Sequence, residues 1–365
     1  MNQKAFISPL QLFIIYINTA IGAGILTLPR SVAEIAKQDM WLSVIVGGIL
    51  LFFAVWIAAR LSQYFPGHTS LEYNRILLGS TLGQIVNIFQ LSLVIAIAAL
   101  ALRTFSFAIK LFLFDLTPPA VLVASILLLA VYAAQYGYTP LLRMQQVSFL
   151  FLSGAFISVL LLGLLGINTE AFLPILSEGI SPILKGAIPS WFAFSGPELI
   201  TGLLFPYLVI PRAAVKAGAA GITFVTFIYT LTVVIAQGNL TAAGAVHAIF
   251  PTVTAFREVE IPDTFIERLD GYLMILWILV YFNSLANLLF FISFGASRLF
   301  RFEYSRSLTV LLAPVLYYFS QLAPTFKEHI AAGDLFSKIS IAWSLGLMPV
   351  LLLLAWYKNK RKQSC

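Results

Sequence analysis

The chain has 365 residues, of which 60% are hydrophobic and only 10% are charged, and its formal net charge is +7. A soluble domain carries about 25% charged residues, so a chain this poor in charge cannot cover a water-facing globule, and most of its surface must face lipid. The net charge does not indicate nucleic-acid binding, because the basic residues lie in short connections between apolar segments and form no basic helix.

The apolar segments predict an all-α membrane protein. A helix of about 20 residues crosses the hydrocarbon core of a bilayer. Segments of that length give about ten transmembrane helices, so residues 1–365 are expected to form one integral membrane domain. It divides into half-repeats at about 9–167 and 187–357, followed by a tail at 358–365. The ten segments lie near residues 9–36, 40–65, 81–112, 118–136, 144–167, 187–209, 217–237, 264–297, 306–323 and 335–357.

Lys and Arg residues predict the orientation, because they concentrate in the cytoplasmic connections of membrane proteins. When the N-terminus is placed in the cytoplasm, most basic residues and few acidic ones fall on the cytoplasmic side. Both termini are then cytoplasmic, which agrees with an even number of spans. The basic residues on this side are Lys4, Arg60, Arg75, Arg143, Arg212, Lys216, Arg298, Arg301, Arg306, Lys358, Lys360, Arg361 and Lys362.

Two connections are longer than simple turns. Residues 66–80 include a short amphipathic piece, Ser70 to Arg75, that is expected to lie along the cytoplasmic face. Residues 238–263, which contain Arg257, Glu258, Glu260 and Asp263, form the longest external segment. Its length suits a functional lid and a passive connector equally well.

The first span contains a helix-breaking stretch, from Gly22 and Gly24 to Pro29. Glycine lowers helix stability, and proline removes a backbone donor. Unpaired backbone groups are tolerated at membrane depth only where they face protein or a water-filled cavity, so the stretch indicates a cavity. The alternative is close packing of a neighbouring helix against the two glycines.

The sixth span contains a second break, Ser195-Gly196-Pro197-Glu198. Ser195 and Glu198 have the spacing of a capping box, and Pro197 suits a first helical turn, so a new helix is expected to begin inside the membrane. The two breaks open two halves of five helices each. Discontinuous helices at matching positions are typical of the inverted-repeat transporter fold of the amino-acid permease (LeuT-like) type, with the substrate between them.

These breaks suggest how a zwitterionic ligand is held. Backbone N–H groups around Gly22 to Ile25 would bind a carboxylate, because a helix N-terminus favours negative charge. Carbonyl groups near Phe192 to Phe194 would accept hydrogen bonds from an ammonium group. Trp191 and Phe194 would form an apolar wall, or an aromatic face for a cation–π contact with the ammonium group.

Glu198 is the only acidic residue in the middle of a predicted span. An ionisable side chain at this depth is a functional candidate by default. It would bind the ammonium group, or carry a proton that couples binding to conformation. Structural capping of the second half-helix is an equally good explanation.

Other polar residues in the spans have less specific roles. Asn283, Ser284 and Asn287 in the eighth span either coordinate an ion or water, or form hydrogen bonds between helices. Arg103 either extends to the outer interface or pairs with an external acid. His68, His247 and His329 all fall in loops or near span ends, which gives no proton relay.

Catalysis and cofactors find no support in the sequence. The only cysteine is Cys365, and there is no H-E-x-x-H pattern, so no enzyme activity, no metal site and no cofactor is predicted. A coupling ion, Na⁺ or H⁺, stays open.

Two motifs resemble the spore-germination permease family, the B subunits of Ger-type germinant receptors within the amino acid–polyamine–organocation superfamily. They are Gly22-Ala23-Gly24-Ile25 followed by Leu28-Pro29-Arg30, and Phe194-x-Gly196-x-Glu198 followed by Pro206. True amino-acid permeases share the first motif, whereas the second favours the germination branch. Length, span count and the short charged tail extend the resemblance over nearly the whole chain.

The resemblance implies a ligand-sensing subunit in the spore inner membrane. It would act with a larger A subunit and a C lipoprotein, and bind a small germinant such as an amino acid to trigger germination. An autonomous secondary amino-acid transporter is the alternative. The expected substrate-binding residues are Gly22, Ala23, Gly24, Ile25, Phe194, Ser195, Gly196, Glu198, Asn283 and Ser284.

Overall fold

The computed structural model describes residues 6–259, 269–300, 302 and 306–363, without the side chains of 361–363. Among the positions used above, Lys4, Glu260, Asp263, Arg301 and Cys365 lie outside the described residues, and so do the side chains of Arg361 and Lys362. The described part is helical throughout its ordered elements, with one isolated β-bridge between Ile7 and Leu208.

Within the described residues, ten helical segments cross the bundle, in two groups of five, as the sequence predicts. Six helical stretches of 29 to 40 residues are long and apolar enough to span a membrane. Two short helices, α4 (Ser70–Leu78) and α11 (Pro251–Arg257), lie in the connections. The crossing segments are α1 (Pro9–Ala20) with α2 (Gly24–Ala36), α3 (Met40–Gln63), α5 (Ser80–Phe112), α6 (Pro119–Ala134), α7 (Tyr138–Gly163), α8 (Ile180–Phe194) with α9 (Pro197–Leu204), α10 (Ala214–His247), α12 (Leu269–Phe300), α13 (Arg306–Gln321), and α14 (Phe326–Ile341) with α15 (Met348–Gln363).

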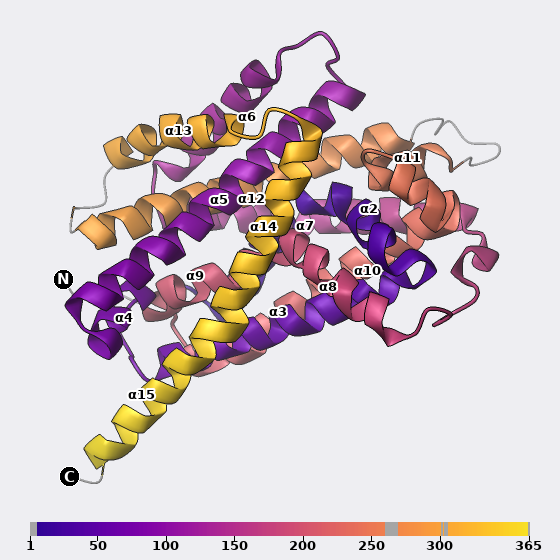
Figure 1. Ribbon diagram of the computed structural model, residues 1–365. Helices are drawn as coiled ribbons and strands as arrows, with labels where there is room; N and C mark the ends of the chain where they lie inside the picture. The colour runs from indigo at the N-terminus through magenta and orange to yellow at the C-terminus, as the bar shows by residue number, and fades with distance from the viewer. Residues whose placement is uncertain (1–5, 260–268, 301, 303–305, 364–365) are drawn as a thin grey trace.

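The opening helices of the two halves pack against each other at the centre of the bundle. Helix α2 packs against α8, α3 packs against α8 and α10, and α1 packs against α10 and α12. In Figure 1 the two termini and α4 lie toward one end of the bundle, at the lower left, while α11 lies toward the other end. This arrangement places both breaks inside the protein, away from either end.

Several helices begin earlier than the apolar segments. The fifth crossing segment begins at Tyr138 rather than at 144, the sixth at Ile180 rather than at 187, and the tenth at Phe326 rather than at 335. Hydropathy indicates which residues lie in the hydrocarbon layer, whereas capping residues determine where the helix itself begins. Thr325, for instance, caps α14 through a capping box with Glu328.

The tenth segment also contains an irregularity that the sequence analysis does not predict. A π-helical stretch, Ala342–Leu347, separates α14 from α15.

The two long connections are both packed. Helix α4 contains the predicted amphipathic piece, and Asn74 on it donates to Asn87 of α5 (2.9 Å). In the segment 238–263, α10 continues to His247 through a kink at Thr241, and α11 packs against α2 and α12. Thr252 of α11 donates to the carbonyl of Ile25 (2.7 Å). Up to Val259 this segment is therefore tied to the first broken helix.

Arg103 holds the connection between α13 and α14. This buried side chain donates to the carbonyls of Ala323 (2.9 Å) and Pro324, and to the side-chain oxygen of Gln321 (3.2 Å). These hydrogen-bond partners are uncharged, and the charge of Glu328, at the start of α14, also acts on the guanidinium group. Arg103 thus satisfies carbonyls of the α13–α14 connection.

Candidate functional site

The first break consists of Ile21–Ala23, between α1 and α2. The amide of Ile21 still bonds to the carbonyl of Ile17 (2.8 Å). The next two N–H groups in the helix start, of Ala23 and Gly24, have no hydrogen-bond partner in the part of the chain that the structure describes, whereas the N–H of Gly22 faces the hydroxyl of Tyr229. The α2 helix thus presents free donors and the positive end of its dipole inside the bundle.

The second break lies at Ser195-Gly196, and its cap differs from the predicted one. The N-cap of α9 is Gly196 rather than Ser195, and Oε2 of Glu198 accepts from the Gly196 amide (2.9 Å). The physical reason is the backbone of Gly196, whose φ of +134° reverses the chain one residue later than the sequence pattern indicates. The hydroxyl of Ser195 is left buried, without a partner among the described residues.

The two breaks touch each other. The hydroxyl of Tyr229 donates to the carbonyl of Ala20 (2.7 Å) and lies 3.1 Å from the carbonyl of Ala193. A Cβ added at Gly24 would overlap the backbone of Ala193, and one at Gly196 would lie 2.7 Å from Cγ2 of Thr19. Close packing and a cavity, treated above as alternatives, therefore occur together.

A small cavity lies between the breaks. The polar groups of its lining residues include the hydroxyls of Thr19, Ser195 and Ser284 and the free N–H groups of Ala23 and Gly24. All twelve lining side chains are uncharged. They belong to Thr19, Ala20, Gly22, Ala23, Gly24, Ile97, Ala101, Phe192, Ala193, Ser195, Ser284 and Leu288.

The structure brings half of the predicted site residues to this cavity. Those that line it are Gly22, Ala23, Gly24, Ser195 and Ser284. Ile25, Phe194, Gly196, Glu198 and Asn283 lie outside its lining.

Glu198 and Phe194 lie behind the cavity wall. Glu198 is fully buried, and its Oε1 accepts from the hydroxyl of Ser340 (3.4 Å), which in turn accepts from Nε1 of Trp191 (3.1 Å). Phe194 packs against Tyr229, with ring centroids 4.8 Å apart. The apolar wall is therefore Phe192 rather than Trp191 and Phe194.

The polar patch of α12 is shared between neighbouring helices. Nδ2 of Asn283 donates to Ser148 of α7 (3.0 Å), and Nδ2 of Asn287 lies 3.5 Å from the hydroxyl of Thr19. Ser284 faces the first break, where a Cβ on Gly22 would be 3.1 Å from its hydroxyl oxygen. Hydrogen bonding between helices thus accounts for Asn283, whereas Oδ1 of Asn287 is buried without a partner among the described residues.

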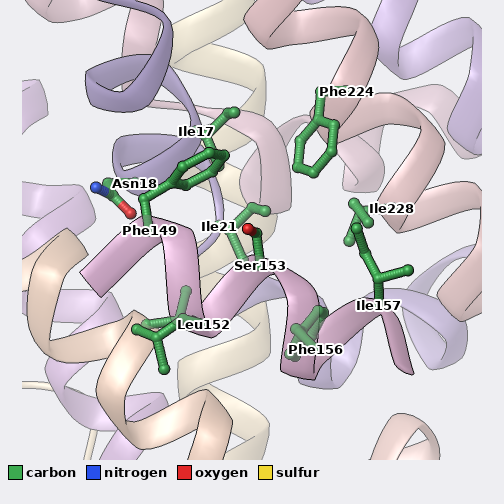
Figure 2. A pocket seen from close by; sticks show the side chains of 11 residues that line it. Ile17, Asn18, Ile21, Phe149, Leu152, Ser153, Phe156, Ile157, Phe224 and Ile228 are labelled. Carbon is green, nitrogen blue, oxygen red and sulfur yellow. The ribbon is translucent and has the colours of Figure 1, made fainter. Parts of the chain in front are cut away.

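A second cavity lies on another side of α1, against α7, α10 and α12. Figure 2 shows Asn18 and Ser153 among its mostly apolar side chains, with Phe149 and Phe156 from α7 and Phe224 from α10. Nδ2 of Asn18 is buried and has no partner in the described part of the chain. This lining suits hydrocarbon better than a charged ligand.

Several lining residues of the cavity between the breaks, the central cavity, could not be predicted from the sequence. Ile97 and Ala101 come from α5, and Leu288 comes from α12. These are ordinary residues of apolar spans, so nothing in the sequence separates them from lipid-facing neighbours. Thr19 and Phe192 lie within three residues of a break, which is the only signal available. No group of three or more metal-ligating residues occurs within the described ranges.

Comparisons with known proteins agree with this architecture. A family model described as "Spore germination protein" matches residues 6–328. Spore germination protein YndE of Bacillus subtilis is 31% identical over 359 residues, covering 98% of each chain. Spore germination protein A2 of the same organism is 26% identical over 342 residues, covering 92% of this chain and 91% of the relative.

The fold has a close counterpart among solved structures. MhsT, solved in complex with L-phenylalanine, superposes with a TM-score of 0.71 over 97% of this chain and 99% of its own. The sequence identity is 13%, so the likeness establishes the fold alone.

Proposed function

Because the chain belongs to the spore germination permease family, we propose that it is the ligand-sensing B subunit of a germinant receptor. It binds a small germinant, such as an amino acid, between the two broken helices. The observation that carries this proposal is the cavity with uncharged polar lining at the contact of the two breaks. In this proposal the chain binds and responds, and it catalyses no reaction.

The charge of the cavity supports a zwitterionic ligand. A ligand with a net charge would need a charged partner, because burying an unpaired charge is costly. None of the lining side chains supplies one. The free N–H groups of Ala23 and Gly24 favour a carboxylate, and the C-terminal carbonyls of α8 favour an ammonium group. An amino acid is neutral overall and carries both groups.

The position of the cavity supports a sensing role. Each half of the chain contributes one break, and Tyr229 joins the carbonyl ends of α1 and α8. A ligand that contacts both breaks would favour the arrangement of the halves in which both sets of contacts form. A larger A subunit and a C lipoprotein would receive this change in the spore inner membrane, with both termini of the chain cytoplasmic.

An autonomous amino-acid transporter is the second candidate function. It is favoured by the fold that the chain shares with MhsT. A transporter would couple ligand movement to Na⁺ or H⁺ and would therefore move its ligand against a gradient without partners.

Binding to purified protein tests the site. We expect one or a few amino acids to raise the thermal unfolding midpoint, and Ser195→Ala to weaken that binding about fivefold to tenfold, since one hydrogen bond is lost. Ser92→Ala is the control, because Ser92 is exposed on α5 and donates to its own helix. Unchanged affinity in Ser195→Ala and Gly22→Leu would remove the proposed site.

Flux measurements separate the two functions. We expect protein reconstituted alone in vesicles to bind the amino acid without accumulating it. Accumulation of labelled amino acid against its gradient, driven by Na⁺ or H⁺, would establish the transporter instead.

A further inference from the structure

A third cavity lies between α2, α8 and α14. Phe192 lines both this cavity and the central one, so its ring stands between them. The other lining residues are Thr27, Ser31, Pro189, His329, Ile330, Gly333 and Asp334. Unlike the central cavity, this outer cavity has titratable side chains in its wall.

The hydrogen bonds of His329 determine what its ring offers to the outer cavity. His329 is 1% exposed, and its Nε2 lies 2.8 Å from the hydroxyl of Thr104. That hydroxyl donates its single proton to the carbonyl of Leu100 (3.2 Å). In the tautomer with the proton on Nε2, the Nε2–H donates to the hydroxyl of Thr104 and Nδ1 is left as an acceptor. Nδ1 is buried and has no partner among the described residues.

The other polar groups of the cavity are acceptors as well. The hydroxyl of Thr27 donates to the carbonyl of Gly24 (3.4 Å), and that of Ser31 donates to the carbonyl of Thr27 (3.3 Å). Their protons are thus used on their own helix, and their lone pairs stay available. Asp334 is exposed and adds a carboxylate.

The neighbouring cationic side chains do not supply hydrogen-bond donors to this cavity. Arg30 is paired with Glu34 (3.1 Å), and Arg103 is held by carbonyls at the end of α13. Lys338 lies one turn beyond Asp334 on the same helix, outside the cavity lining. A cavity whose polar atoms are acceptors requires a ligand that is rich in donors.

We propose that the outer cavity is a second binding site, and that it takes the primary ammonium group of a small aliphatic molecule. The three N–H donors of an ammonium match Nδ1 of His329, the hydroxyls of α2 and the carboxylate of Asp334. The aliphatic part lies against Phe192, Pro189 and Ile330. This site differs from the central one, which suits a neutral zwitterion, and it does not depend on the function proposed there.

Binding of n-propylammonium chloride to the purified full chain tests the proposal, with sodium propionate and propan-1-ol as matched anionic and neutral probes. We expect propylammonium to bind and the other two to bind at least about tenfold more weakly, since bonds to a charged donor are the stronger ones. Asp334→Asn and His329→Leu should each weaken propylammonium binding by about tenfold or more. If His329→Leu fails to fold, Ser31→Ala takes its place.

Two controls locate the site. Asp115→Asn removes an exposed acid in the α5–α6 connection and should leave binding unchanged. Ser284→Ala alters the central cavity and should also leave it unchanged. Propylammonium binding that is absent, that persists in folded Asp334→Asn and His329→Leu, or that is lost only in Ser284→Ala would overturn the outer site. Amino-acid binding at the central cavity is measured separately, so the two proposals fail independently.

Discussion

At the level of single residues, Gly22 and Gly24 differ in what stands opposite them. A side chain at Gly22 would enter the cavity toward Ser284, whereas one at Gly24 would meet the backbone of Ala193. We therefore expect Gly22→Leu to abolish ligand binding while the protein still inserts and folds, because the new side chain fills the binding volume. The germinant response and the ligand-dependent thermal shift measure this.

Gly24→Ala should instead reduce stability. Overpacking of this kind costs about 1–3 kcal/mol, and backbone atoms cannot move aside as a flexible side chain can. The measurement is the thermal unfolding midpoint without ligand. Gly154→Ala is the matched control, since a Cβ on this α7 glycine meets nothing within 4 Å and should leave the midpoint unchanged or raise it. A Gly24→Ala protein as stable as this control would contradict the contact between the breaks.

Glu198 offers a second prediction at this scale, because its carboxylate bonds to the Gly196 amide and Ser340 but does not line the cavity. Glu198→Gln keeps an acceptor for that amide, so we expect ligand affinity and its pH profile to stay unchanged. Glu198→Leu leaves the buried amide without its partner, which costs about 1–3 kcal/mol of unfolding free energy. A loss of ligand affinity in Glu198→Gln would assign the carboxylate to ligand binding or to a proton-coupled step.

Local chemistry explains which residues could be predicted. The breaks lie where glycine and proline place them, at Ile21–Ala23 and at Ser195-Gly196, because these residues weaken helix pairing wherever they stand. The cavity walls from α5 and α12 could not be predicted, since packing alone decides which apolar residue of a span faces inward. His329 shows the same limit: the sequence places it in a loop or near a span end, but only the structure shows that it is buried in the first turn of α14.

At the level of elements, Tyr229 of α10 joins α1 to α8 through the carbonyls of Ala20 and Ala193. Tyr229→Phe removes the donor and leaves both buried carbonyls without this partner. We expect a loss of about 1–3 kcal/mol in unfolding free energy. Weaker ligand binding should accompany it, because the two breaks are no longer held together. Thermal unfolding with and without ligand measures both effects.

Tyr281→Phe provides the matched control for this change. Tyr281 is also fully buried, and its hydroxyl has no partner among the described residues. Losing that hydroxyl should therefore leave stability unchanged or raise it slightly. Equal behaviour of the two variants would mean that the bridge from Tyr229 contributes nothing to the site.

Hydropathy located all ten crossing segments but not all of their ends. Helix α14 extends from Phe326, through Lys327, Glu328 and Asp334, before its apolar part begins. These polar residues lie in a capped helix, which an apolar window cannot detect. The π-helical stretch Ala342–Leu347 has no sequence signal beyond Gly346, because it depends on packing against neighbouring helices.

At the level of the whole molecule, the distribution of Lys and Arg predicts cytoplasmic termini. The fold adds that both termini lie toward one end of the bundle (Figure 1). The only cysteine is Cys365, so a Cys365→Ser protein is a cysteine-free background for labelling. In this background we expect a membrane-impermeant maleimide added to intact cells to label Asp115→Cys, in the α5–α6 connection, and not Lys358→Cys, near the end of α15.

Permeabilised cells supply the control, because both cysteines are exposed and should then react. Labelling of Lys358→Cys in intact cells, with Asp115→Cys protected, would reverse the orientation. The outer cavity, lined by His329 and Asp334 at the end of the bundle away from both termini, would then face the cytoplasm. An ammonium compound would reach it from inside the cell, and the central cavity could not be the first site that an external germinant meets. The labelling pattern therefore decides the direction from which a ligand approaches both cavities.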